Sequence, residues 1–231
     1  MAQDQRLCPR CWGMGHLAYD VQPGHALFGK TTPCPTCAGP AQSAYREAIA
    51  GLPADLRTVH FLPAPAWQMP AVTHLQNILS SRAPAGFVTL HGPCGVGKSH
   101  LLAAAVNAAK AAGWPAIYTL TADLLAHLRR AYAPDAAQTS DELSDRYRQV
   151  RVLALDELAL FNPTPWAAEQ FTLLIEHRYE NASERLTLVA SDAAWDDLPP
   201  RIVSRLRDAR HRVFEFGAVE AEAVDLRQIR A

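Results

Sequence analysis

Short apolar runs alternate with helical patterns through most of the chain after residue 70. The runs span residues 87–90, 116–120, 152–155, 186–189 and 213–216, and each has the length and content of a buried strand. Strands that alternate with helices are typical of a parallel sheet covered on its faces. The pattern therefore predicts an α/β fold with a five-stranded parallel sheet flanked by helices.

For three of the intervening helices, the sequence contains residues that mark where the helix begins or ends. The first ends before Gly113, because glycine commonly terminates helices. The second begins near Thr121, and the third begins at Thr164 and Pro165, where threonine suits the cap and proline the first turn. The apolar positions of the three helices are, in chain order, Leu101, Leu102, Ala105, Val106 and Ala109; Leu124, Leu125 and Leu128; and Phe171, Leu174 and Ile175.

The first part of the chain has a different character. Residues 1–45 hold all but one of the cysteines and show little helical periodicity, and a stretch rich in proline and alanine follows them. We therefore expect a small module in residues 1–45, a linker and the start of the main domain in residues 46–70, and the main domain in residues 71–231.

Composition and charge limit where the protein acts. Apolar residues make up 49% of the 231, and the net charge of −1 excludes attraction of the whole molecule to nucleic acid. The chain has no apolar run of about eighteen residues and no apolar stretch near its start, so we expect a cytoplasmic protein with no membrane contact. Two interpretations fit the next group of arginines, either a local basic patch that contacts DNA or a solvated face, because acidic residues interleave with them. The group is Arg129, Arg130, Arg146, Arg148 and Arg151.

The most specific motif is the string G-P-C-G-V-G-K-S at residues 92–99, between a predicted strand and a predicted helix. Glycine tolerates the φ angles that let backbone N–H groups wrap an anion, and the helix N-terminus adds partial positive charge. Lys98 can reach the β- and γ-phosphates, and the Ser99 hydroxyl can ligate Mg²⁺. We expect ATP to contact Gly92, Pro93, Cys94, Gly95, Val96, Gly97, Lys98, Ser99 and His100.

Two acidic residues follow the apolar run at 152–155. Phosphoryl transfer needs one carboxylate near the metal and another near the attacking water, both beside the phosphate loop. We expect Asp156 to join the Mg²⁺ shell through water and Glu157 to polarise the hydrolytic water. The alternative is that the two carboxylates cap the next helix.

Two Cys-x2-Cys pairs lie near the start of the chain, Cys8 with Cys11 and Cys34 with Cys37. In a reducing cytosol such pairs favour a metal over disulfides. The pairs can bind one tetrahedral Zn²⁺, with the spacer between them folded as a short hairpin. Four thiolates leave no open position for catalysis, so we expect a docking module; a purely structural zinc staple is the alternative.

The string at residues 198–206, L-P-P-R-I-V-S-R-L, adds a family-specific signal. Together with the phosphate loop and the acidic pair, it resembles the AAA+ ATPases of the initiator and helicase-loader branch, from Leu56 to the C-terminus. Within that branch the chain is similar to the DnaC/DnaI-type helicase loaders and the IstB-type transposition ATPases. It implies an AAA+ P-loop ATPase preceded by a zinc-binding module.

The resemblance also assigns roles to arginines. It implies that Arg201, or else Arg205, is an arginine finger that reaches ATP in a neighbouring subunit, and therefore that the protein self-associates. A guanidinium there stabilises charge that develops on the γ-phosphate. The alternative is an exposed basic helix.

Two further positions follow from the resemblance. The family commonly has asparagine as a γ-phosphate sensor after the fourth strand, where this chain has Asp192 preceded by Ser191. Aspartate repels phosphate, so we expect slower or differently tuned hydrolysis, with Ser191 as an alternative contact. Arg227 matches a cis arginine of some relatives, and the chain stops soon after it, so we expect no full C-terminal lid.

The resemblance implies an ATP-dependent helicase loader that binds a replicative DnaB-type helicase and delivers it to single-stranded DNA. An N-terminal zinc module ahead of the ATPase resembles the DnaI-type loaders, whereas IstB-type proteins generally carry a helical N-terminal region. The alternative is an IstB-type ATP-dependent regulator of transposition that binds duplex DNA.

Overall fold

Five parallel strands form the central sheet, in the order β4-β5-β6-β3-β7. The computed structural model describes residues 16–18, 31–33, 51–62, 64–132, 140–158 and 164–217. The strands are β3 Gly86–His91, β4 Ala116–Leu120, β5 Val152–Asp156, β6 Leu186–Ser191 and β7 Arg212–Glu215. The predicted five-stranded parallel sheet is confirmed, and β7 begins one residue earlier than its apolar run.

The register aligns the strands, so that they begin at one edge of the sheet and end at the other. Gly86 pairs with Leu186, and Leu186 pairs with Val152, so β3, β6 and β5 start together. Every residue of β5 and β6 is buried, which explains why these strands have continuous rather than alternating apolar patterns. The polar groups that follow the strands therefore lie along one C-terminal edge of the sheet.

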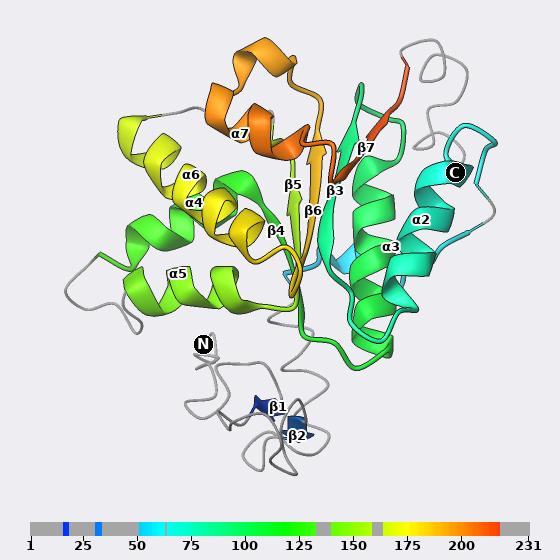
Figure 1. Ribbon diagram of the computed structural model, residues 1–231, viewed down its shortest axis with the longest axis horizontal. Helices are drawn as coiled ribbons and strands as arrows, with labels where there is room; N and C mark the ends of the chain where they lie inside the picture. Colours follow the sequence, from blue (N-terminus) through cyan, green and yellow to red (C-terminus); the bar gives the residue numbers. More distant parts are fainter. Residues whose placement is uncertain are drawn as a thin grey trace. The chain divides into compact units, whose positions relative to one another are not determined.

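Helices cover both faces of the sheet (Figure 1). On one face, α3 (Lys98–Ala111) packs against the sheet and α2 (Met69–Leu79) packs against α3. The other face carries α4 (Thr121–Arg130), α5 (Ser140–Gln149), α6 (Pro165–Glu180) and α7 (Pro200–Leu206). Single 3₁₀ turns occur at η1 (Ala54–Leu56) and η3 (Trp195–Asp197).

The three predicted helices are confirmed with their end signals. After α3 the chain turns at Gly113, where φ is 85°. Thr164 caps α6, because its Oγ1 accepts a hydrogen bond from the Ala167 N–H at 3.3 Å. The apolar patterns did not predict α2, which starts inside the segment assigned as a linker, or α5, which is mostly polar.

The stretch before α2 packs onto the main unit. Leu52 and Val59 are buried, and the Asn107 amide on α3 donates to the backbone carbonyls of Leu56 at 3.0 Å and Val59 at 2.8 Å.

The chain divides into two units, Met1–Gly51 and Leu52–Ala231. No helix in the described ranges is long and apolar enough to cross a membrane.

In the first unit, the residues that the structure describes form one pair of strands. β1 (His16–Ala18) and β2 (Thr31–Pro33) pair in antiparallel orientation, and both belong to the spacer between the two cysteine pairs. The predicted zinc ligands Cys8, Cys11, Cys34 and Cys37 lie outside the described residues.

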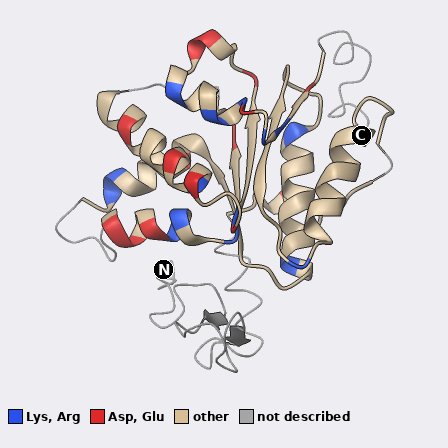
Figure 2. Cartoon of the chain, in the orientation of Figure 1, with Lys and Arg blue, Asp and Glu red and all other residues tan. Residues whose placement is uncertain are grey.

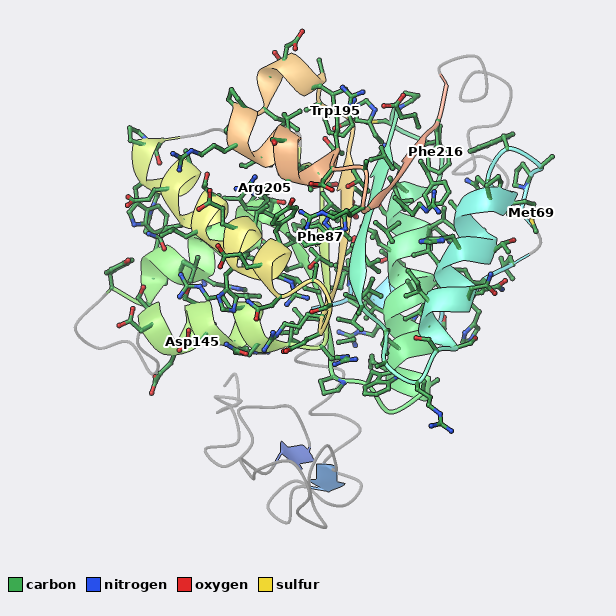
Figure 3. All side chains as sticks on the ribbon, viewed as in Figure 1. Met69, Phe87, Asp145, Trp195, Arg205 and Phe216 are labelled. Atoms are coloured by element: carbon green, nitrogen blue, oxygen red, sulfur yellow. The ribbon has the colours of Figure 1, made fainter. Side chains whose placement is uncertain are left out.

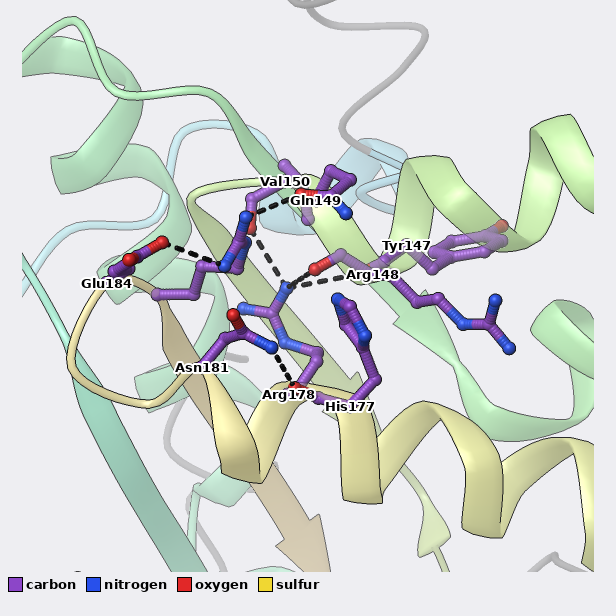
Figure 4. Close-up of polar contacts among 9 residues, drawn as sticks. Tyr147, Arg148, Gln149, Val150, His177, Arg178, Asn181 and Glu184 are labelled. Atoms are coloured by element: carbon purple, nitrogen blue, oxygen red, sulfur yellow. Dashed lines mark hydrogen bonds and ion pairs between the residues drawn. The ribbon is translucent and has the colours of Figure 1, made fainter. Parts of the chain in front are cut away.

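A fully buried arginine joins the helical layer to the start of the sheet. Arg178 of α6 has 0% exposure, and its five hydrogen bonds reach the carbonyl oxygens of Tyr147, Arg148, Val150 and Leu186 and the hydroxyl of Thr187, at 2.6–3.1 Å. Figure 4 shows the contacts to the C-terminal end of α5, whose partial negative charge favours a cation. Burial, with a smaller effect from the Arg185 guanidinium, lowers the pKa of Arg178 to about 9, so the side chain stays charged at neutral pH.

The variant Arg178→Lys should lower the free energy of unfolding by about 3 kcal/mol, because an ammonium has too few donors for this set of acceptors and leaves buried carbonyls unpaired. Urea unfolding measures the loss. The matched control is Arg148→Lys, since the partly exposed Arg148 side chain makes only a 3.6 Å ion pair with Asp145; it should change the stability by less than about 1 kcal/mol. Equal losses in the two variants would contradict the role of Arg178.

Candidate nucleotide-binding site

The phosphate loop connects β3 to α3 at the C-terminal edge of the sheet. Gly95 and Gly97 have φ values of 86° and 82°, which glycine adopts without strain. Gly97 is the N-cap of α3, so the next three residues of the motif begin the helix. The strand, loop and helix that the motif requires are therefore present, with the helix N-terminus available to an anion. The structure places Pro93, Cys94 and Val96 in the loop and Lys98, Ser99 and His100 in the first turn of α3.

Gly92 begins the loop where there is no room for a side chain. A Cβ atom at this position would lie 2.5 Å from the Phe216 carbonyl oxygen and 2.9 Å from the Phe216 Cβ. Its φ of 148° is also one that other residues avoid. The end of β7 is close because the Phe216 N–H donates to the His91 carbonyl at 2.8 Å. Glycine is thus required here by packing as well as by phosphate approach.

Lys98 lies inside the loop with 9% exposure. Its Nζ donates to the carbonyl oxygens of Gly92 at 2.7 Å and Pro93 at 2.8 Å. The loop carbonyls therefore hold the ammonium in place, which positions a charge to meet the phosphates of a nucleotide.

Gln68, a residue that no sequence pattern singled out, also contacts the loop. The residue directly precedes α2 and is 3% exposed, and its Nε2 donates a hydrogen bond to the Val96 carbonyl. The neighbouring Trp67 ring contacts Phe216 edge to face at 5.6 Å. The sequence carries no signal for this contact, because the two partners come together only when α2 packs on α3.

Asp156 ends β5 at the same edge and is 2% exposed. Its Oδ1 accepts a hydrogen bond from the Glu157 N–H at 2.9 Å, and its Oδ2 accepts one from the Tyr118 hydroxyl. The Thr121 hydroxyl donates to the Asp156 carbonyl at 3.1 Å. Burial raises the pKa of Tyr118, and the Asp156 carboxylate raises it further, so the phenol stays a neutral donor.

Glu157 has an unusual backbone conformation. Within the described ranges it is the only residue other than glycine with positive φ, at 56°. Such a conformation costs on the order of 1 kcal/mol for a side chain like glutamate. Strain of this kind gathers at functional positions, and here it falls on the residue predicted to polarise water.

The sensor position faces the phosphate loop through Asp192. The Cys94 thiol donates to Asp192 Oδ2 at 2.8 Å. Ser191 is fully buried, and its Oγ accepts a hydrogen bond from the Ala193 N–H at 3.2 Å. Of the two residues considered for this position, the structure brings the side chain of Asp192 to the loop.

An aromatic stack fixes the segment that carries Asp192. The His91 ring lies on the Trp195 ring with centroids 4.3 Å apart, and His91 Nε2 donates to the Ala193 carbonyl at 2.9 Å. Trp195 Nε1 also donates to Glu215 Oε1 at 3.3 Å, next to the end of the sheet (Figure 3). The ends of β3, β6 and β7 are therefore held together beside the loop.

The two candidate finger arginines differ in environment. The Arg201 side chain is 79% exposed, with a 3.7 Å ion pair to Glu176. Arg205, labelled in Figure 3, instead packs over the Tyr179 ring at 4.7 Å, and the same ring carries Arg210 at 4.9 Å and lies 6.3 Å from the Phe87 ring. Arg205 is therefore engaged within its own domain, whereas Arg201 projects outward. Arg227 lies outside the described residues.

The fold and this edge of the sheet define a P-loop nucleotide-binding protein with the AAA+ fold. The phosphate loop follows β3, the acidic pair follows β5, and β6 lies between these strands with Ser191 and Asp192 at its end. Residues 53–200 match the family described as IstB-like ATP binding protein. This match covers more than half of the chain, and the protein belongs to that family.

Individual relatives agree with this assignment. An ATP-binding protein of insertion sequence IS232 from Bacillus thuringiensis subsp. berliner is 31% identical over 120 residues, which are 51% of this chain and 46% of that protein. The chain spans less than half the length of the curated relatives it matches.

Two solved structures share the fold. AMPPCP-bound DnaA from Aquifex aeolicus has a TM-score of 0.59 and 23% identity, over 67% of this chain and 48% of that one. The DnaC helicase loader has a TM-score of 0.60 and 19% identity, over 71% of this chain and 99% of that one. At these identities the likeness shows the fold alone.

The variant Gly92→Ala should lower the free energy of unfolding by about 2 kcal/mol, because the added methyl group meets the Phe216 backbone. Nucleotide affinity should fall as well, since the loop must shift. Urea unfolding and titration with a fluorescent ATP analogue measure the two effects.

The matched control is Gly113→Ala. Gly113 has a φ of 85°, but a Cβ there meets nothing within 4 Å. This variant should cost about 1 kcal/mol through strain alone and leave nucleotide affinity unchanged. If Gly92→Ala behaved like Gly113→Ala, the close approach of Phe216 would have no energetic consequence.

Proposed function

We propose that this protein is an ATP-dependent helicase loader that binds a replicative helicase and helps to deliver it to single-stranded DNA. The observation that carries the proposal is the combination of two Cys-x2-Cys pairs with an AAA+ domain that aligns over 99% of the DnaC helicase loader chain. Cys8, Cys11, Cys34 and Cys37 bind Zn²⁺ and form the docking module for the helicase.

ATP binds at the phosphate loop. Lys98 and the backbone N–H groups of the loop contact the phosphates, which replace the loop carbonyls as partners of the ammonium. Ser99 and Asp156 offer the hard oxygen donors that suit Mg²⁺, and α3 packs against β5, so the donor set fits this ion. When bound, Mg²⁺ neutralises charge on the β- and γ-phosphate oxygens. Glu157 orients the attacking water.

Hydrolysis is slow in the isolated protein under this proposal. Asp192 places a carboxylate beside the loop, where its charge opposes that of the γ-phosphate, and its contact with Cys94 supports this position. A protein that holds ATP for a long time acts as a switch: it stays in the ATP state until assembly supplies the missing catalytic group.

Arg201 supplies that group to ATP in a neighbouring subunit. Its 79% exposure and its single long ion pair support this role, because a trans finger has to project away from its own domain. The packing of Arg205 against Tyr179 supports a structural role for that residue.

The variant Arg201→Ala should keep ATP affinity within about twofold of wild type but lose the hydrolysis that assembly stimulates, a fall of roughly 10³-fold for a complete finger. Turnover measured across a range of protein concentrations tests this. Arg205→Ala is the matched arginine control and should keep the stimulation; Lys98→Ala should lose ATP binding. Full stimulation in Arg201→Ala would exclude it as the finger.

Transposition is the second candidate function, and a specific observation favours it. The matching family is that of IstB-like ATP-binding proteins, and the IS232 relative belongs to an insertion sequence. In this alternative the protein binds duplex DNA and engages a transposase. Figure 2 shows acidic as well as basic positions on α4 and α5, and the only charged residues of α7 are its two arginines, so charge alone favours neither DNA form.

Native mass spectrometry of the protein with its host's replicative helicase separates the two functions. Wild type should form a defined complex that depends on ATP, and Cys34→Ser should lose the complex while its AAA+ domain still binds ATP. A helicase complex that Cys34→Ser retains would remove the docking role of the zinc module. No complex under either condition, together with ATP-dependent filaments on duplex DNA, would favour the transposition role.

A further inference from the structure

Tyr118 and Asp156 form a buried contact between neighbouring strands at the nucleotide edge of the sheet. Each residue is 2% exposed, and the Tyr118 hydroxyl donates a hydrogen bond to Asp156 Oδ2. The register pairs Tyr118 with Ala154, two residues before Asp156, so the tyrosine and the aspartate share one face of the sheet. The small Ala154 leaves room for the Tyr118 ring to extend along β5.

Two donors from different elements fix the plane of the Asp156 carboxylate. The Glu157 N–H holds Oδ1 at 2.9 Å from within the turn after β5, and the Tyr118 hydroxyl holds Oδ2 from β4. A carboxylate with both oxygens held has a defined orientation for its remaining lone pairs. Of these two donors, only the Tyr118 hydroxyl can be removed by a substitution, because the Glu157 N–H belongs to the backbone.

We infer that Tyr118 is a positioning residue for Mg²⁺: its hydroxyl holds Asp156 in the orientation in which the carboxylate accepts a hydrogen bond from metal-bound water. This inference rests on the proposed function, in which Asp156 belongs to the Mg²⁺ shell. Tyr118 acts through Asp156 rather than by contact with the nucleotide. Outer partners of this kind tune metal affinity because they set the orientation of the group that serves the metal.

The hydroxyl, rather than the ring, carries the effect. Phenylalanine would fill the same buried space, and burying a hydroxyl is unfavourable unless its hydrogen bond is made. A packing role and a positioning role therefore make different predictions for Tyr118→Phe: packing depends on the retained ring, whereas the metal response depends on the lost hydroxyl.

The experiment measures binding of a fluorescent ATP analogue to the full-length protein, first with a chelator and then with increasing Mg²⁺. Tyr118→Phe should keep the metal-free affinity within about twofold, and its half-saturating Mg²⁺ concentration should rise roughly tenfold, the effect expected for a hydrogen bond to a charged group. Mn²⁺ binding in the presence of the nucleotide, followed by electron paramagnetic resonance, should weaken by a similar factor.

The matched control is Tyr147→Phe. Tyr147 is also a buried tyrosine, and its hydroxyl contacts His127 Nδ1 at 3.4 Å. This variant removes the same group from a tyrosine whose hydroxyl meets His127 of α4 rather than Asp156, so it should leave the Mg²⁺ response unchanged. A similar rise in half-saturating Mg²⁺ for both variants would overturn the inference, because it would reflect general loosening.

The variant Asp156→Asn tests the metal role of Asp156 separately from the positioning role of Tyr118. If it leaves the Mg²⁺ response unchanged, the proposed metal role of Asp156 fails. If it weakens the response and Tyr118→Phe does not, the positioning role alone fails. In the double variant, Tyr118→Phe should add nothing further; additive effects, or loss of the fold in Tyr118→Phe, would show a structural role and overturn the inference.

Discussion

Both faces of β5 and β6 are covered by helices, and this constraint decides where polar groups can lie. A parallel strand buried on two faces has no solvent-facing side, so polar side chains gather where the strands begin and end. At the beginning, Arg178 donates hydrogen bonds to buried carbonyls of α5 and of β6. At the end, the phosphate loop, Asp156 and Asp192 lie along one edge. The structural cation and the candidate site thus occupy opposite edges of the same sheet.

The candidate site combines tight packing with local strain. Gly92 tolerates the close approach of Phe216. Glu157 has a left-handed backbone conformation, and within the described ranges all other residues with positive φ are glycines. Both features are maintained because neighbouring strands hold the loop from several sides. Gln68 supports Val96, the stack of His91 on Trp195 fixes the segment after β6, and Tyr118 fixes Asp156. The geometry that meets the nucleotide therefore depends on residues outside the motifs themselves.

Asp192, which the resemblance predicts at the γ-phosphate sensor position, contacts the phosphate loop in the structure. Asp192 is close to the loop because its Oδ2 accepts a hydrogen bond from the thiol of Cys94, a residue of the phosphate loop. A carboxylate at this place fits a protein that retains ATP and waits for a partner. Under the proposed function the exposed Arg201 also depends on assembly, because an outward arginine reaches a nucleotide only in a neighbouring subunit.

Local sequence is enough to predict the strand and helix periodicity, the phosphate loop and the acidic pair after β5, because each depends on residues that are near neighbours in the chain. The ends of α3 and α6 followed for the same reason, from Gly113 and Thr164. Long-range packing was needed to establish that α2 and the polar α5 form, and that Gln68 contacts Val96. The same holds for the contact of Tyr118 with Asp156 and for the difference between the exposed Arg201 and the packed Arg205. These features join residues distant in sequence, and neither periodicity nor a local motif records which buried donor will meet which acceptor once the sheet has closed.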